Sequence, residues 1–171
     1  MHRLALYLLL LIFVSATSCS SSRKLAGKKV SLNHLSEKLG FRVTPKDDLK
    51  LYQEAAKWLG VPYRYGGNNF AGVDCSGLVC NMYKNVYRIS LERTADGMYK
   101  KNCRKISRAK LRPGDLVFFN TAKKRKSVSH VGIFLKNNIF IHATTASGVR
   151  LSTLDDRYYK QRWIKGGKVK K

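Results

Sequence analysis

The sequence is poor in acidic residues, with 10 Asp and Glu against 34 Lys and Arg, which gives a formal net charge of +24. Such an excess favours a polyanionic partner, although a lysine-rich soluble surface would have the same composition. Nucleic acid is not the expected partner, because the chain lacks both zinc-finger spacing and an aromatic RNP-like strand.

Long apolar runs are also missing, because Leu4 to Val14 is too short to span a bilayer. It follows a basic start and has the length of a signal-peptide core. The next five residues, Ser-Ala-Thr-Ser-Cys, resemble a bacterial lipobox in which Cys19 is lipidated, with Ala16 where Leu is usual. We predict a signal peptide over residues 1–18. The alternative is an ordinary cleavage site with Cys19 as an incidental thiol.

Both a lipobox and an ordinary cleavage site imply that the protein is exported. Export restricts which polyanionic partner the basic chain is expected to meet. An anionic cell-wall polymer or an anionic lipid surface fits an exported protein better than nucleic acid does. We expect a lipoprotein on the periplasmic side of the envelope, with the outer membrane favoured over the inner one. A monomer is expected.

Cysteine is scarce as well, and none of the four residues has CxxC or CxxH spacing, so no metal site is predicted. With Cys19 lipidated, three cysteines remain. Cys80 and Cys103 could form a disulfide in an oxidising compartment, or both could stay free.

The chain is predicted to divide into a tether over residues 19–46 and a folded domain over residues 47–171. A short helix around Leu32, Leu35 and Leu39 is expected in the tether, ended by Gly40. Apolar spacing predicts a helix over residues 49–59. From residue 111 onwards the pattern is that of strands, at 116–119, 130–135, 139–143, 148–151 and 163–164. Helices followed by an antiparallel sheet indicate an α+β fold, whereas residues 88–110 show no readable pattern.

One stretch points to nucleophilic chemistry. Asp74 is a good helix N-cap, and the apolar residues after Cys75 repeat with helical spacing. Cys75 is therefore expected in the first turn of a buried helix, where the helix dipole favours a thiolate. A small buried structural cysteine is the alternative.

Two histidines complete a candidate nucleophile, base and orienting group. His130 would accept the Cys75 proton, and His142 would hold the His130 ring through its second nitrogen. A two-residue turn without a bulge would place these histidines on opposite faces of the hairpin. The hypothesis therefore predicts an odd-length loop at residues 136–138 or a nearby β-bulge.

These motifs together carry a family resemblance over about residues 47–168. Asp74-Cys75-Ser76-Gly77, the run from Pro113 to Phe119, His130-Val131-Gly132-Ile133 and His142-Ala143 resemble the NlpC-type papain-like cysteine peptidases. Residues 62–67, Pro-Tyr-Arg-Tyr-Gly-Gly, are similar to the lipoprotein branch typified by the Spr-like murein endopeptidases.

The resemblance implies a Cys helix packed on a central antiparallel sheet, with Cys75, His130 and His142 as catalytic residues. It also implies that Tyr63 lies near the oxyanion or substrate. Asp74 and Ser76 are weaker candidates for contacting a substrate amine, because capping already accounts for Asp74.

The implied substrates are peptidoglycan stem peptides, cleaved without a metal or organic cofactor. Two other functions remain open: amidase or acyltransferase chemistry on the same residues, or a non-catalytic wall-binding lipoprotein. The scissile bond is not readable, because loops at residues 88–110 and 123–129 would build the cleft walls.

Overall fold

The computed structural model describes residues 31–122 and 127–170. The chain divides into two compact units, and the division falls between Asp47 and Asp48. The predicted signal peptide and Cys19 lie outside the described residues. In the part that is described, no helix combines the length and the apolar character needed to cross a membrane.

The first unit contains the short helix expected in the tether. Residues 31–39 are helical, and Gly40 ends the helix with a φ of 68°. Ser36 holds the turn that follows: its hydroxyl donates to the Leu32 carbonyl at 2.7 Å and accepts from the Val43 N–H at 2.9 Å.

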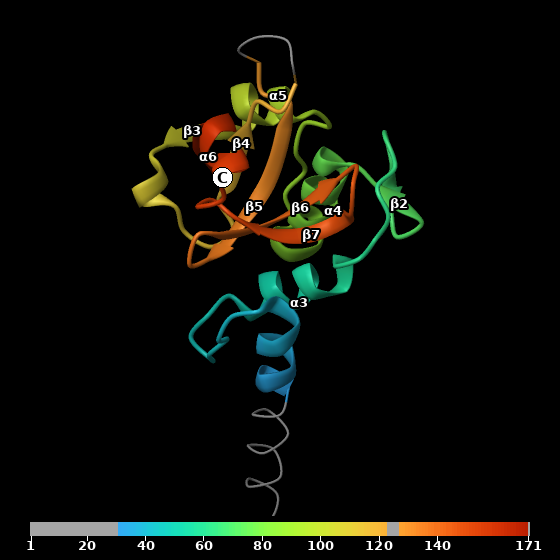
Figure 1. Ribbon diagram of the computed structural model, residues 1–171, viewed down its shortest axis with the longest axis vertical. Helices are drawn as coiled ribbons and strands as arrows, with labels where there is room; N and C mark the ends of the chain where they lie inside the picture. Colours follow the sequence, from blue (N-terminus) through green and yellow to red (C-terminus); the bar gives the residue numbers. More distant parts are fainter. Residues whose placement is uncertain (1–30, 123–126, 171) are drawn as a thin grey trace, which may run out of the picture. The chain divides into compact units, whose positions relative to one another are not determined.

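The second unit is built on an antiparallel sheet, as the α+β prediction requires (Figure 1). Within the described residues this sheet has six strands in the order β3-β8-β4-β5-β6-β7, beside a two-stranded sheet of β1 and β2. The strands are β1 (Asn68–Asn69), β2 (Gly72–Val73), β3 (Cys103–Ile106), β4 (Leu116–Phe119), β5 (His130–Lys136), β6 (Ile139–Thr144), β7 (Gly148–Thr153) and β8 (Trp163–Val169).

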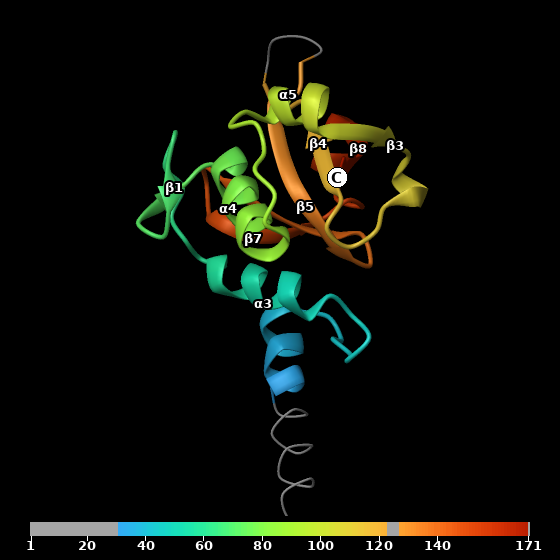
Figure 2. The ribbon, with the colours of Figure 1, turned by 180° about the vertical axis from the view of Figure 1, so that it is seen from behind.

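Helices cover both faces of the sheet. The helical segments are α3 (Leu49–Trp58), α4 (Cys75–Tyr87), α5 (Ala95–Gly97), a π-helical turn (Met98–Asn102), a 3-10 turn (Arg108–Lys110) and α6 (Arg157–Arg162). Helix α4 packs on β5, β6 and α3, and Figure 2 shows it in front of the sheet, whereas α6 is in front in Figure 1.

This two-sided cover explains why β4 is apolar along its whole length. Leu116, Val117, Phe118 and Phe119 are all fully buried, although their side chains alternate between the two faces. The strand predicted at 116–119 is confirmed. On the α6 side, Phe119 and Phe140 pack with Tyr159 and Trp163 in a hydrophobic cluster.

The hairpin of β5 and β6 contains the irregularity that the two histidines require. Asn137 and Asn138 both have positive φ, at 52° and 60°, as a two-residue type I′ turn needs. Lys136 pairs with Ile139, but Phe134 pairs with Phe140, so the register shifts by one residue between them. Leu135 is therefore a β-bulge, and the predicted bulge near the turn is confirmed.

The bulge places both histidines on one face of the sheet. His130 lies four residues before Phe134, and His142 lies two residues after Phe140. Because side chains alternate and Phe134 pairs with Phe140, His130 and His142 both point to the α6 side. His130 is also paired with Phe119 of β4, on the same face.

Helix α3 supports the bulge from the other side. The Tyr52 hydroxyl donates to the Leu135 carbonyl at 3.1 Å, and both residues are fully buried. We expect Tyr52→Phe to leave that carbonyl unpaired and to lower the free energy of unfolding by about 1–3 kcal/mol. Urea unfolding measures this loss. The matched variant Tyr65→Phe, at a side chain that is 90% exposed, should change stability by less than about 0.5 kcal/mol.

The segments that the sequence did not reveal depend on distant partners. β3 lies in the stretch without a readable pattern and pairs with β8 at the end of the chain, for example Cys103 with Val169. β8 extends well beyond the two residues predicted, through a Gly-Gly pair on which Leu111 and Phe118 pack closely. Cys75, Cys80 and Cys103 are free thiols, so the disulfide alternative is not present.

Candidate active site

Cys75 is the first residue of α4, as predicted. Asp74 caps the helix, and its carboxylate accepts the Gly77 N–H at 2.6 Å. The expectation of a favoured thiolate needs correction. Burial raises the pKa of the Cys75 thiol above its ordinary value, although backbone N–H groups of Val131 and Ser76 oppose that rise. The structure therefore holds a neutral thiol that must lose its proton to a base.

His130 and His142 are in direct contact. His130 Nε2 and His142 Nδ1 are 2.8 Å apart, and the rings are steeply inclined, with 79° between their planes. This contact uses Nε2 of His130 and leaves its Nδ1 as the nitrogen available to a proton donor. His130 also lines one cavity together with Cys75, so the three predicted residues come together.

The second nitrogen of His142 has partners that sequence reasoning missed. His142 Nε2 is 2.9 Å from the Ser152 hydroxyl and 3.3 Å from the Tyr159 hydroxyl. Ser152 stands on β7 diagonally across from His142, and Tyr159 stands on α6. The period-two pattern of β7 could have placed Ser152 on this face, but nothing in the sequence located Tyr159.

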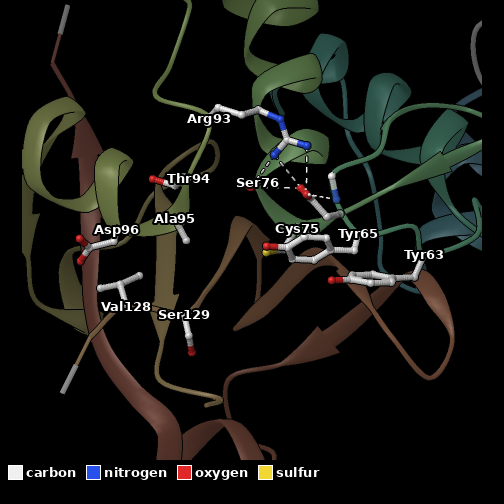
Figure 3. A pocket seen from close by; sticks show the side chains of 12 residues that line it. Tyr63, Tyr65, Cys75, Ser76, Arg93, Thr94, Ala95, Asp96, Val128 and Ser129 are labelled. Carbon is white, nitrogen blue, oxygen red and sulfur yellow. Dashed lines mark hydrogen bonds and ion pairs between the residues drawn. The ribbon is translucent and has the colours of Figure 1, made fainter. Parts of the chain in front are cut away.

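Two cavities flank Cys75. The larger is about 480 Å³ in volume, and Figure 3 shows Tyr63, Tyr65 and Arg93 on the side of Cys75, with Asp96 and Ser129 across from them. The smaller, about 170 Å³, also includes Tyr63, Cys75 and Ser129. The shared residues place Cys75 where the two cavities meet, which leaves room for substrate on both sides of the sulfur.

Asp74 and Ser76 line the larger cavity, but the Asp74 carboxylate is already heavily engaged. It accepts hydrogen bonds from the N–H groups of Gly66 (2.9 Å) and Gly77 and from the Ser76 hydroxyl (3.0 Å). Burial acts to raise the pKa of Asp74, but hydrogen bonds, above all from Arg93, hold it below its ordinary value.

Arg93 is the charged residue that the sequence did not single out. Its Nη1 donates to Asp74 at 2.8 Å and to Ser76 at 2.7 Å, and its Nη2 donates to Asp74 at 3.0 Å and to the Gly67 carbonyl at 2.9 Å. Arg93 thus links the start of α4 to the loop before it. It lies in the stretch that showed no pattern, so no local signal identified it.

The two histidines should make stability depend on pH. Burial lowers the pKa of His130 from 6.5 to about 4 and that of His142 well below 6.5. The unfolded chain then binds more protons than the folded one between about pH 4 and 6.5, so stability should fall as the pH falls through that window. Urea unfolding at several pH values measures the slope. It should be shallower in His130→Gln, and an equal slope would contradict the assignment.

Comparisons with known proteins find similar chains. The profile of the NlpC/P60 family matches residues 60–168. The murein DD-endopeptidase and murein LD-carboxypeptidase MepS of Escherichia coli K12 is 36% identical over 120 residues, which cover 70% of this chain and 62% of that protein. The match thus spans less than two thirds of the length of MepS.

Two further relatives each match at least 70% of this chain. The probable endopeptidase NlpC of Escherichia coli K12 is 38% identical over 119 residues, covering 70% of this chain and 76% of that protein. A solved NLP/P60 family structure from Staphylococcus aureus, described as similar to a lipoprotein, superposes with a TM-score of 0.64 at 33% identity. The superposition covers 74% of this chain and 42% of the solved chain. The solved relative has the same papain-like architecture of helices and sheet.

Proposed function

Because this chain belongs to the NlpC/P60 family, we propose that it is a cysteine peptidase that hydrolyses peptide bonds in peptidoglycan stem peptides or cross-links. The observation that carries the proposal is the 2.8 Å contact between His130 and His142 beside a cavity that both His130 and Cys75 line. The curated names of MepS and NlpC, a murein endopeptidase and a probable endopeptidase, support the reaction and the substrate.

Catalysis begins with proton transfer. His130 accepts the Cys75 proton at Nδ1 while its Nε2–H donates to His142, and the sulfur attacks the carbonyl carbon of the stem peptide. The resulting imidazolium then protonates the leaving amine, which leaves an acyl-enzyme. His130 next takes a proton from water, the hydroxide adds to the acyl carbon and breaks its bond to sulfur, and His130 returns the proton to the Cys75 sulfur.

The oxyanion formed by this attack needs hydrogen-bond donors beside the sulfur. The backbone N–H of Cys75 lies at the start of α4, where N–H groups have no partner within the helix. Tyr63 lines both cavities beside Cys75, so its hydroxyl is a second candidate donor. Burial raises the pKa of Tyr63, which keeps the phenol protonated and able to donate.

The cell envelope is the proposed location. A lipid on Cys19 would hold the domain at a membrane, with residues 19–46 as the tether and residues 47–171 as the catalytic domain. The basic excess of the chain, +24 over all 171 residues, would draw the protein towards anionic wall polymers. We propose that the protein acts as a monomer.

Digestion of purified peptidoglycan tests the proposed function. The wild-type chain and Cys75→Ala are incubated with the same preparation, and soluble products are identified by mass. New stem-peptide fragments from the wild type alone would establish the hydrolase and identify the bond. Fragments from both proteins would contradict the role of Cys75. Binding without cleavage by either would favour a wall-binding lipoprotein, and cleavage of other acyl bonds would favour an amidase or transferase.

A further inference from the structure

We propose that Ser152 and Tyr159 act as positioning residues that set which nitrogen of His142 carries the proton, and through it the proton position on His130. The inference rests on the proposed function, because it extends the set of Cys75, His130 and His142. It concerns residues on β7 and α6 that neither the sequence reasoning nor the comparisons assign.

The contacts form one continuous chain of hydrogen-bonding groups. His130 Nε2 meets His142 Nδ1 at 2.8 Å, and His142 Nε2 meets the Ser152 hydroxyl at 2.9 Å. The Tyr159 hydroxyl is 3.3 Å from the same His142 nitrogen and is hydrogen-bonded to Ser152. His142 is fully buried, so solvent cannot replace a partner that its ring loses.

Only one direction of proton donation along this series of hydrogen bonds leaves His130 able to act as a base. If His142 Nε2–H donates to Ser152, then His142 Nδ1 accepts from His130 Nε2–H, and His130 Nδ1 is free to accept a proton. If Ser152 instead donates to His142 Nε2, every donation reverses. His130 then carries its proton on Nδ1 and cannot accept the one from Cys75.

Tyr159 favours the productive direction. Burial raises the pKa of Tyr159, so the phenol keeps its proton, and its oxygen is able to accept a hydrogen bond from Ser152. With its own proton directed at Tyr159, Ser152 presents a lone pair to His142. Tyr159 also lines the smaller cavity.

Charge near His142 helps to keep its ring neutral. Arg150 stands directly opposite His142 in the β6–β7 register. Burial, then His130, then the Arg150 cation lower the pKa of His142, so the ring stays neutral and keeps one nitrogen as an acceptor in either tautomer. The ring therefore relays orientation between Ser152 and His130 and does not itself take up a proton.

The tautomer can be measured without any substrate. In the full-length chain carrying Cys75→Ala and nitrogen-15 histidine, NMR shifts distinguish protonated from unprotonated ring nitrogens. We expect His142 to be protonated on Nε2 and His130 on Nε2. Ser152→Ala should shift both towards a mixture, whereas Thr153→Val, which removes the neighbouring exposed hydroxyl, should change neither. An unchanged tautomer in Ser152→Ala would overturn the inference.

Kinetics on the active enzyme provide the second readout. Loss of one such hydrogen bond should lower kcat by about tenfold in Ser152→Ala with little change in KM, and Ser152→Thr should restore most of it. Tyr159→Phe should also lower kcat, and adding it to Ser152→Ala should cost little more, because both act through one hydroxyl. A tenfold loss that Ser152→Thr fails to restore, with the wild-type tautomer retained, would indicate a packing role only.

The proposed function and the role of Ser152 can be contradicted independently of each other. If the wild type cleaves no peptidoglycan but Ser152→Ala changes the tautomers, then the hydrogen-bond inference stands and the substrate assignment is wrong. If peptidoglycan is cleaved and the tautomers are independent of Ser152, the proposed function stands and the role of Ser152 is wrong.

Discussion

His130→Ala is expected to lower kcat/KM for peptidoglycan cleavage by about 10³-fold, because it removes both the base for Cys75 and the acid for the leaving amine. The effect should be large because the Cys75 thiol is neutral at physiological pH, its pKa being raised by burial. No other described histidine lines either cavity beside Cys75.

The comparison with His142→Asn makes this prediction sharper. Asparagine can still offer an oxygen to His130 Nε2–H, so this variant should lose only about tenfold in kcat, in line with one hydrogen bond weakened. Both variants are first checked for cooperative unfolding, since His130 and His142 are buried. If His130→Ala keeps more than a tenth of wild-type activity, His130 is not the base.

The second large effect is expected at Arg93, which neutralises the Asp74 carboxylate. Arg93→Ala would leave that carboxylate, whose side chain is only 11% exposed, without a cation. Arg93 itself is 42% exposed, so solvent weakens the pair, and we expect a loss of roughly 2 kcal/mol in the free energy of unfolding. Activity should fall as well, because the N-terminal cap beside Cys75 loses its anchor to Gly67.

Three variants test the cause of that loss. Arg93→Lys should recover only part of it, because a single ammonium cannot span Asp74, Ser76 and Gly67 in the way a planar guanidinium does. Adding Asp74→Asn to Arg93→Ala should restore stability by removing the unpaired charge. The matched control is the surface ion pair of Arg108 Nη2 and Asp155 Oδ1, which are 2.6 Å apart. Arg108→Ala should lower the free energy of unfolding by less than about 1 kcal/mol. Urea unfolding and peptidoglycan release measure all of them.

The sequence was most informative where local chemistry decides the structure. An acidic cap before Cys75, apolar residues at helical spacing and a buried run at Leu116 each depend on neighbours within a few positions. The predicted link between the two histidines and a bulge also followed from local rules, because the alternation of side chains leaves few arrangements.

Long-range partners could not be predicted in the same way. Arg93 acquires its role from Asp74 and Gly67, and Tyr159 acquires its role from the side chains of β6 and β7. The pKa of Cys75 is a further case: the helix start acts as expected on the thiol, but the extent of burial depends on how the sheet packs against α4. Such effects arise from three-dimensional packing and leave no periodic pattern.

The bulge at Leu135 also restricts how the hairpin can change in length. His130 and His142 share a face only because one residue of β5 is left unpaired between them and the turn. An insertion or deletion of one residue in this segment would turn one imidazole towards α4, unless a second bulge compensated. Two residues could be added at the Asn137-Asn138 tip without that cost. The hairpin can therefore vary freely in even steps, whereas an odd step separates the base from its orienting group.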